Sequence, residues 1–294
     1  MADALPRYQR PAEPATPPPP DRTPIPPEDL EAAIAASDLS EGSKALLRGL
    51  MRLGRTATFR GGGIGLDYAG LLKSAVRPDI VGAHVAEAAE VLRRHDIDLL
   101  LVPGMSGFPI GTMYAMAAGI PALLLRKEPV HADLLERTMP PGAFILPSYT
   151  SAGEVVMSAD PMALLDITAP IFARQAERAG ESDLDLRLRV AGADDIIDKA
   201  TMARAVSESA RRLGRFAADR FERDWRERTG DQRPLSLDIE MVTWVTPLLK
   251  AYNRPDAQLA KVTTAPPFAG LRIGGIYTSP RAVGIEGVGT LAFG

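Results

Sequence analysis

Two adjacent carboxylates, Asp194 and Asp195, follow an apolar run in the stretch RVAGADDIIDKATMARAV, residues 189–206. Neighbouring acids at the end of a strand repel each other, so their ionised forms need a compensating group nearby. Carboxylate oxygens accept hydrogen bonds from vicinal hydroxyls, and a hydrated Mg²⁺ would relieve the repulsion. A long helical pattern begins just after the acids, and the start of a helix attracts anions. The stretch therefore predicts a site for a ligand that carries hydroxyls beside a phosphate.

Two other apolar runs end in residues that suit such a ligand. The run IDLLLVP (97–103) leads into the glycine-rich PGMSGFPIG, whose backbone amides can face an anion before the next helix begins. The run PALLLRK (121–127) ends in the cations Arg126 and Lys127. In an open parallel sheet, ligands bind beyond the carboxyl ends of the strands. We therefore expect these residues and the two acids to surround a sugar with phosphates at both ends and a divalent cation.

The elements that must position these groups alternate between strands and helices. Apolar residues recur at helical spacing in VGAHVAEAAEVLRRHD, whereas GAFILPSY and GEVVMSAD have the composition of strands. The stretch MALLDITAPIFARQAERAG is helical with a break expected at Pro170, and a long helix is expected over about 199–223. The nearly unbroken apolar runs suit strands that are buried on both faces. The alternation from about residue 80 to residue 215 predicts a doubly wound α/β domain.

The chain divides by composition into four predicted parts. Residues 1–27 are proline-rich and are expected to be extended or disordered, because proline removes amide donors and fixes φ. Residues 28–55 are predicted to form two short helices, with Ser43 as the N-cap of the second. Residues 56–223 hold the α/β domain. Residues 224–294 form a C-terminal extension, in which LDIEMVTWVTPLLKAYN is either helix or strand and a glycine-punctuated hairpin or loops follow.

The composition excludes several classes of function. The 294 residues include no cysteine, which rules out disulfides, thiolate metal sites and cysteine nucleophiles. The formal net charge of −3 supplies no general attraction to nucleic acid or membranes. There is neither a secretory signal pattern nor an apolar run of about 20 residues, so we expect a cytoplasmic protein. The stretch 211–228 mixes arginines with aromatic residues, but its interleaved acids favour a solvated amphipathic helix over an RNA contact.

The motifs together resemble those of a known enzyme family. VAGADDIIDKATMARAV resembles the ribose-phosphate-binding motif of the type I phosphoribosyltransferases. DIDLLLVPGMSGFPIGTMYAMAAGIPALLLRKE resembles the pyrophosphate loop of that family and the strand that follows it. FRGGGIGLDYAGLL falls where orotate phosphoribosyltransferases carry a Phe…Ser-Gly…Tyr-x-Asp segment, so the layout is most similar to that branch. The resemblance covers roughly residues 56–215, with an insertion near 168–186.

The resemblance implies a fold and a reaction. The fold is a parallel sheet flanked by helices, with a small hood and, here, N- and C-terminal extensions. The reaction transfers a phosphoribosyl group from phosphoribosyl pyrophosphate (PRPP) to a nitrogenous base, which the sequence does not identify, and releases pyrophosphate. The cofactor is Mg²⁺, held through PRPP and water near the two acids rather than by direct protein ligands. Family members often dimerise, so a homodimer is compatible with the resemblance.

The resemblance also assigns roles to individual residues. Asp194 and Asp195 would contact the ribose hydroxyls, and Arg126 and Lys127 would neutralise the pyrophosphate. These four residues are the expected catalytic set. The expected phosphate-binding residues include two next to the pyrophosphate, Ser106 and Gly107. The others hold the 5′-phosphate at the start of the following helix: Lys199, Ala200 and Thr201.

One segment departs from the family pattern and leaves two hypotheses open. Asp198, Lys199 and Ala200 stand where the family has small or hydroxylic residues and a glycine, and Ala200 falls where a positive φ is expected. If Asp198 caps the helix, its carboxylate fills the anion site, which favours an inactive relative that binds PRPP or a nucleotide as a sensor, or a scaffold. If Asp198 points away and Lys199 reaches inward, the transferase hypothesis is favoured. A third hypothesis, a hydrolase on the same α/β scaffold, lacks support, because the sequence contains no G-x-S-x-G motif.

Overall fold

The computed structural model describes most of the chain. The described residues are 5–9, 23–58, 64–73, 75–130, 139–147, 153–180, 183–278 and 281–293. Residues 59–63, which belong to the FRGGGIGLDYAGLL stretch, lie outside the described residues.

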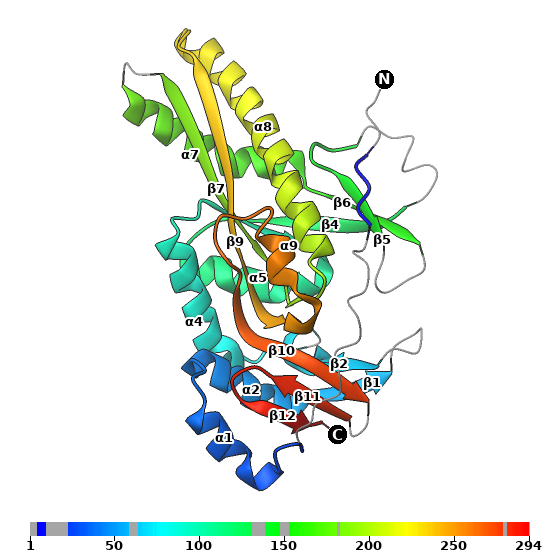
Figure 1. Cartoon of the computed structure of the whole chain (residues 1–294). Helices are drawn as coiled ribbons and strands as arrows, with labels where there is room; N and C mark the ends of the chain where they lie inside the picture. The colour runs from blue at the N-terminus through cyan, green and yellow to red at the C-terminus, as the bar shows by residue number, and fades with distance from the viewer. Residues whose placement is uncertain are drawn as a thin grey trace.

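One mixed sheet runs through the molecule in the strand order β12-β11-β10-β9-β7-β3-β4-β6-β5 (Figure 1). Its central strands are parallel to one another. These are β3 (Leu99–Pro103), β4 (Ala122–Pro129), β7 (Leu184–Ala193), β9 (Leu235–Leu249) and β10 (Phe268–Thr278). Antiparallel strands extend each end of the sheet: β5 (Phe144–Pro147), β6 (Glu154–Ser158), β11 (Arg281–Ile285) and β12 (Gly289–Ala292).

Helices cover both faces of this sheet. One face packs on α7 (Pro161–Ala179) and α8 (Thr201–Thr229), and the other on α2 (Glu41–Leu53), α4 (Pro78–Arg94) and α5 (Gly104–Ala118). Along β3, Leu99 and Leu101 join the first layer of the core, whereas Leu100 and Val102 join the second. Because successive strand side chains point to opposite faces, a strand buried on both sides must be apolar throughout. The expected α/β class, a parallel sheet flanked by helices, is confirmed.

Smaller elements surround the main sheet. A separate antiparallel pair, β1 (Arg55–Thr58) and β2 (Ile64–Asp67), is followed by the short helix α3 (Ala69–Leu72). The remaining elements are η1 (Pro27–Asp29), α1 (Leu30–Ala36), β8 (Ile196–Ile197), η2 (Ala251–Asn253) and α9 (Pro255–Leu259).

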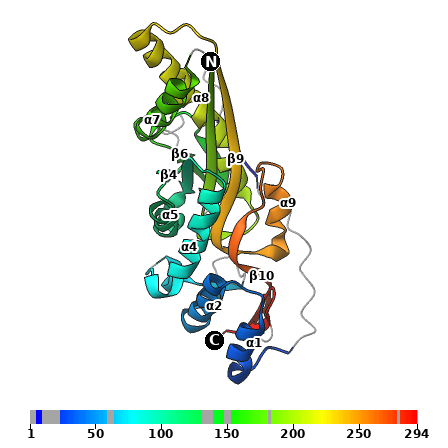
Figure 2. The same ribbon diagram turned by 90° about the vertical axis from the view of Figure 1, so that its left-hand side faces the viewer.

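Residues 224–294, predicted from the sequence to be a C-terminal extension, instead supply two strands of the central parallel sheet. The stretch that was compatible with helix or strand is β9, which pairs with β7 from Leu184↔Leu235 to Ala193↔Val245. The two strands run side by side along their length in both views (Figures 1 and 2). β10 then pairs with the other edge of β9. β9 lies between two partners, and its second half is buried without interruption.

Three local expectations differ from the structure. Pro170 does not break its helix, since α7 is continuous. It lies on the exposed side of α7, where water can bond the carbonyl that loses its amide donor. The N-cap of α2 is Ser40, whose side chain accepts the amide of Ser43, so Ser43 is one turn inside the helix. The glycine-rich stretch after β3 is not a loop, because α5 begins at Gly104 with a positive φ of 61°.

The described parts of the proline-rich segment lie against the folded chain. Tyr8 donates its backbone amide to the carbonyl of Ile145 at 2.9 Å, and its hydroxyl donates to Glu208 at 2.7 Å. The amide of Ile25 donates to the carbonyl of Thr290 at 2.8 Å. None of the helices in the described ranges combines the length and apolar composition needed to cross a bilayer.

A buried histidine lies in the core layer formed by α4 and α5. The Nε2 atom of His84 is 2.7 Å from the hydroxyl of Tyr114, and its ring stacks on Phe268 with centroids 5.5 Å apart. Within the described part of the chain, its Nδ1 has no hydrogen-bond partner. Burial lowers the pKa of His84 to about 4, because the charged imidazolium would lose its hydration.

We predict that His84→Gln reduces the acid sensitivity of the fold. In the native chain, protons bind the unfolded state more tightly, because its histidine pKa of 6.5 is higher than the folded value. The His84 contribution to stability is therefore present above pH 6.5 and is lost as the pH falls towards 4, by about 3 kcal/mol in total. Urea titrations at several pH values measure this slope. His95→Gln, at the partly exposed end of α4, controls for the loss of a histidine in general. An identical pH slope in the native and His84→Gln proteins would contradict the prediction.

Candidate functional site

A cavity of about 400 Å³ lies beyond the carboxyl ends of the central strands. β3 has β4 on one side and β7 on the other, so the chain order reverses at β3. Open α/β sheets bind ligands at this kind of switch point. The sequence-predicted residues that line the cavity are Ser106, Lys127, Asp194, Asp195, Lys199, Ala200 and Thr201. Tertiary structure thus brings together groups that follow β3 and β7 with Lys127 from within β4, which continues to Pro129 rather than ending at the two cations.

Two expected site residues do not line this cavity. Arg126 is exposed, and successive side chains of β4 point to opposite faces, so only Lys127 of the pair reaches the cavity from the described part of that strand. Gly107 is buried in the first turns of α5, directly against Asp194. A Cβ at Gly107 would lie 2.9 Å from Asp194 Oδ1 and 3.4 Å from its Cα. Gly107 therefore allows α5 to approach the acids closely.

Asp195 is compensated by two residues that the sequence analysis missed. Its side chain is 2% exposed, and the Tyr68 hydroxyl donates to its Oδ2 at 3.0 Å. Lys73 Nζ lies 3.4 Å from the same oxygen and 4.8 Å from the centre of the Tyr68 ring. A buried acid pair requires such a partner, but the sequence holds 34 lysines and arginines and does not single out Lys73. Only the placement of β2 and α3 beside the end of β7 identifies it.

Asp194 has a different environment from its neighbour. It is partly exposed to the cavity, and its Oδ1 accepts the backbone amide of Asp195 at 2.9 Å. Burial raises the pKa of Asp194 well above its ordinary value, and the negative charge of Asp195 raises it further. Burial lowers the pKa of Lys127, although the nearby charge of Asp194 opposes that change. A further positive charge beside Asp194 would therefore favour its ionised form.

Asp198 does not cap α8. It accepts hydrogen bonds from Lys250 Nζ at 3.0 Å and from the amide of Asn253, and α8 has no side-chain cap in the described structure. The helix start is therefore not filled by the chain's own carboxylate. Ala200 precedes the helix with a φ of 58°, the left-handed conformation that was expected at this position. The methyl group makes that conformation less favourable than it would be for glycine.

Thr201 places an unused donor at the start of α8. It is the first residue of a 29-residue helix and is 4% exposed. Its buried Oγ1 has no hydrogen-bond partner within the described residues, and the residue Thr201 lines the cavity. Buried hydroxyls are nearly always hydrogen-bonded, so this one is suited to a ligand. A helix start with an added hydroxyl donor favours an anion such as phosphate.

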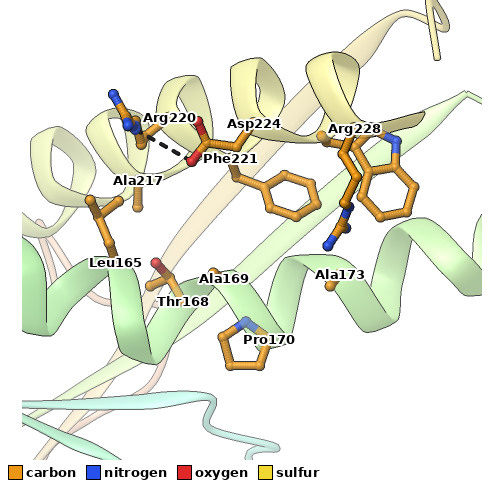
Figure 3. A pocket seen from close by; sticks show the side chains of 11 residues that line it. Leu165, Thr168, Ala169, Pro170, Ala173, Ala217, Arg220, Phe221, Asp224 and Arg228 are labelled. Carbon is orange, nitrogen blue, oxygen red and sulfur yellow. Dashed lines mark ion pairs between the residues drawn. The ribbon is translucent and has the colours of Figure 1, made fainter. Parts of the chain in front are cut away.

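A second cavity, of about 440 Å³, lies between α7 and α8 and shares no lining residue with the first (Figure 3). Its charges are already paired: Arg220 lies 3.4 Å from Asp224, and Arg228 lies over the ring of Trp225 at 5.2 Å. It offers no carboxylate pair and no open helix start among the described residues. The acid-lined cavity is therefore the candidate site.

The carboxylates suit a metal that arrives with its ligand. Among the described residues there is no group of three or more histidine, aspartate or glutamate side chains that could hold a metal by itself. Mg²⁺ is commonly bound through one or two carboxylates together with substrate phosphates. The raised pKa of Asp194 marks the place where a cation would be stabilised. The donor set therefore fits Mg²⁺ carried by a phosphorylated ligand.

No protein-family model matches the sequence, and no curated protein matches it. Several solved structures do. The adenine phosphoribosyltransferase of Giardia lamblia, complexed with 9-deazaadenine, matches with a TM-score of 0.49 and 13% identity over 79% of this chain and 98% of its own. That of Rhodothermus marinus matches with a TM-score of 0.46 and 17% identity over 78% and 99%. That of Trypanosoma brucei, in complex with AMP, pyrophosphate and ribose-5-phosphate, matches with a TM-score of 0.43 and 14% identity over 77% and 78%. All three TM-scores are below 0.5, so these structures assign no function to this chain, and the orotate-like layout stays a prediction.

We predict that Ala200→Gly stabilises the protein by up to about 1 kcal/mol, because glycine adopts a positive φ without steric cost. The same substitution at Ala86, an exposed position inside α4, is expected to destabilise by about 1 kcal/mol. Chemical denaturation of both variants measures the two effects. A loss of stability at both positions would show that Ala200 is not strained.

Proposed function

We propose that this protein is a phosphoribosyltransferase that binds PRPP with Mg²⁺ in the acid-lined cavity and transfers the phosphoribosyl group to a nitrogenous base. The observation that carries the proposal is the buried hydroxyl of Thr201 at the start of α8, which has no hydrogen-bond partner among the described residues. It shares the cavity with Asp194 and Lys127. The cavity thus holds a hydroxyl that can donate to a phosphate, a carboxylate that can accept from two neighbouring ribose hydroxyls, and a cation. Together these groups match the parts of a phosphorylated ribose.

In this proposal, the start of α8 binds the 5′-phosphate. The Thr201 hydroxyl and the first amides of the helix donate to its oxygens, and Lys199 and Ala200 line the same region. Asp198 does not compete for those amides, because its carboxylate is held by Lys250 and Asn253. Binding the phosphate at a fixed point would orient the ribose towards the two acids.

The acids then act on the ribose. During transfer, the bond from ribose C1 to the pyrophosphate oxygen breaks and pyrophosphate leaves with the electron pair. A nitrogen lone pair of the base forms the new bond to C1, and the proton on that nitrogen is lost to water. Positive charge develops on the ribose ring, and carboxylates beside it stabilise that charge. Asp195 is held in place by Tyr68 and Lys73, so it positions the pair. Asp194 faces the cavity and is proposed to contact the ribose hydroxyls.

The pyrophosphate end is assigned to Ser106 and Lys127, both of which line the cavity. Gly107 contributes by allowing α5 to lie against Asp194. Arg126 is left out of the proposed site, because it is exposed and outside the lining formed by the described residues. Mg²⁺ bound to the diphosphate, next to Asp194, would neutralise charge on the leaving group.

The alternative function is a relative that binds PRPP or a nucleotide without turnover, as a sensor or scaffold. The feature that favours it is Ala200, which puts a strained methyl-bearing residue where the family pattern has glycine. The two functions share the same binding site. They differ in whether PRPP is consumed when a base is present.

The test is calorimetric titration of PRPP with Mg²⁺, followed by pyrophosphate release with a panel of purine and pyrimidine bases. We predict that the native protein binds PRPP and that Thr201→Val weakens binding about tenfold, through loss of one hydrogen bond to a charged group. Thr168→Val is the matched control, because the Thr168 hydroxyl bonds to Leu164 within α7.

Each outcome decides between the hypotheses. No binding of PRPP by the native protein would remove the transferase. Binding that survives Asp195→Asn unchanged would contradict the site assignment. Binding without pyrophosphate release for any base would favour the sensor or scaffold.

We also propose that the protein forms a homodimer through α5. This helix contains no charged residue, yet Met105 and Met116 on it are both 79% exposed. A helix that is apolar on all sides is normally buried, so a second copy would cover this face.

We predict that Met116→Glu converts the protein to a monomer, because dimerisation would bury an unpaired charge. Met162→Glu, at another exposed methionine on α7, should leave the assembly unchanged. Sedimentation velocity distinguishes the species. A native protein that sediments as a monomer at all concentrations would end this proposal.

A further inference from the structure

Lys250 is held beside the candidate phosphate site by the backbone. It follows the last residue of β9, and its amide donates to the carbonyl of Ile197 at 2.9 Å. The short strand β8 pairs in parallel with β9, with Ile197 opposite Leu249. The residues that follow each strand, Asp198 and Lys250, are therefore neighbours whatever their side chains do. They are distant in sequence, and only this pairing brings them together.

The side chains of these neighbours form an ion pair on the wall of the cavity. Lys250 Nζ lies 3.0 Å from Asp198 Oδ2, and both side chains are partly exposed. Both residues line the cavity with Thr201. The other oxygen of Asp198 accepts the side-chain amide of Asn253. Because partly exposed ion pairs contribute little net free energy, this pair can exchange for a stronger partner.

A phosphate at the start of α8 would be such a partner. A phosphate monoester carries a charge of about −1.5 to −2 and three acceptor oxygens, whereas a carboxylate carries one negative charge. Asn253 would keep Asp198 in place after Lys250 moved, because its amide bonds the oxygen that Lys250 does not use. Lys250 can therefore supply a cation to the ligand, while Asn253 keeps the Asp198 carboxylate away from the phosphate.

We propose that Lys250 is a phosphate-binding residue of this site and that Asp198 is an internal competitor that holds it when no phosphate is present. The ligand class is the terminal phosphate monoester of a phosphorylated sugar. This inference rests on the proposed function, since it concerns the same cavity. It adds a binding residue that directly follows β9, outside the part of the chain that carries the sequence motifs.

The alternative is that the ion pair only braces the loop between β8 and α8. The two roles predict opposite signs for one substitution. If the pair is a brace, removing either partner loosens the loop and weakens phosphate binding. If Asp198 competes for Lys250, removing its charge strengthens phosphate binding, whereas removing Lys250 weakens it.

The experiment is calorimetric titration of ribose 5-phosphate into the native chain, Lys250→Met, Asp198→Asn and the double variant, with ribose as the control ligand. We expect Lys250→Met to weaken binding about tenfold, by loss of one charge-assisted contact. We expect Asp198→Asn to tighten binding several-fold, and the double variant to fall between the two single variants. Lys250→Arg should retain most of the native affinity, because the positive charge is kept.

Thermal denaturation of each variant separates binding from folding. Affinity changes of opposite sign in Lys250→Met and Asp198→Asn support the inference. It is overturned if both variants weaken binding together, or if Lys250→Met binds ribose 5-phosphate as tightly as the native protein. If Lys250→Met does not fold, the sign of the Asp198→Asn effect decides the question alone.

Failure of this inference is distinguishable from failure of the proposed function. Lys250-dependent binding of ribose 5-phosphate, without pyrophosphate release from PRPP for any base, would leave the inference standing and remove the transferase. If Lys250→Met transfers the phosphoribosyl group with the native KM for PRPP, the transferase stands and the inference about Lys250 is overturned.

Discussion

The parallel pairing of β7 with β3 on one side and with β9 on the other is the constraint on which the site depends. Parallel strands end at the same edge of a sheet, so whatever follows them must meet there. Ser106 follows β3, the two acids follow β7, and Lys250 follows β9. No local turn could assemble these groups, because they are separated by long stretches of sequence. The burial of both faces of these strands holds their ends in register.

Charge compensation is the second requirement that shapes the site. Burying the Asp195 carboxylate would cost folding free energy without Tyr68 and Lys73, which both contact its Oδ2. Asp194 forms no ion pair among the described residues and its pKa is raised, so its ionised form is stabilised when further positive charge enters the cavity. The two neighbours therefore differ in role although they are identical in type. One is held by the protein, and the other is available to a ligand.

The segment before α8 combines features that oppose and favour an anion. Ala200 adopts a left-handed conformation at some cost, and Asp198 places a negative charge nearby. The opposing charge is restrained by Lys250 and Asn253, and the hydroxyl of Thr201 is left without a partner among the described residues. A departure from a sequence motif is thus balanced by residues from a different part of the chain. The balance depends on the short ladder between β8 and β9.

Local patterns in the sequence were sufficient for the elements with short-range causes. The apolar run at β3 and the helical spacing in α4 follow from backbone geometry and burial within a few residues, whereas the positive φ of Ala200 was expected only from the family resemblance. The sequence also identified the acids and their need for compensation. It could not identify Tyr68, Lys73 or Lys250 as partners, or tell which of Arg126 and Lys127 faces the cavity. Those facts depend on which strands are neighbours and on which face a side chain points to, and both are set by long-range packing.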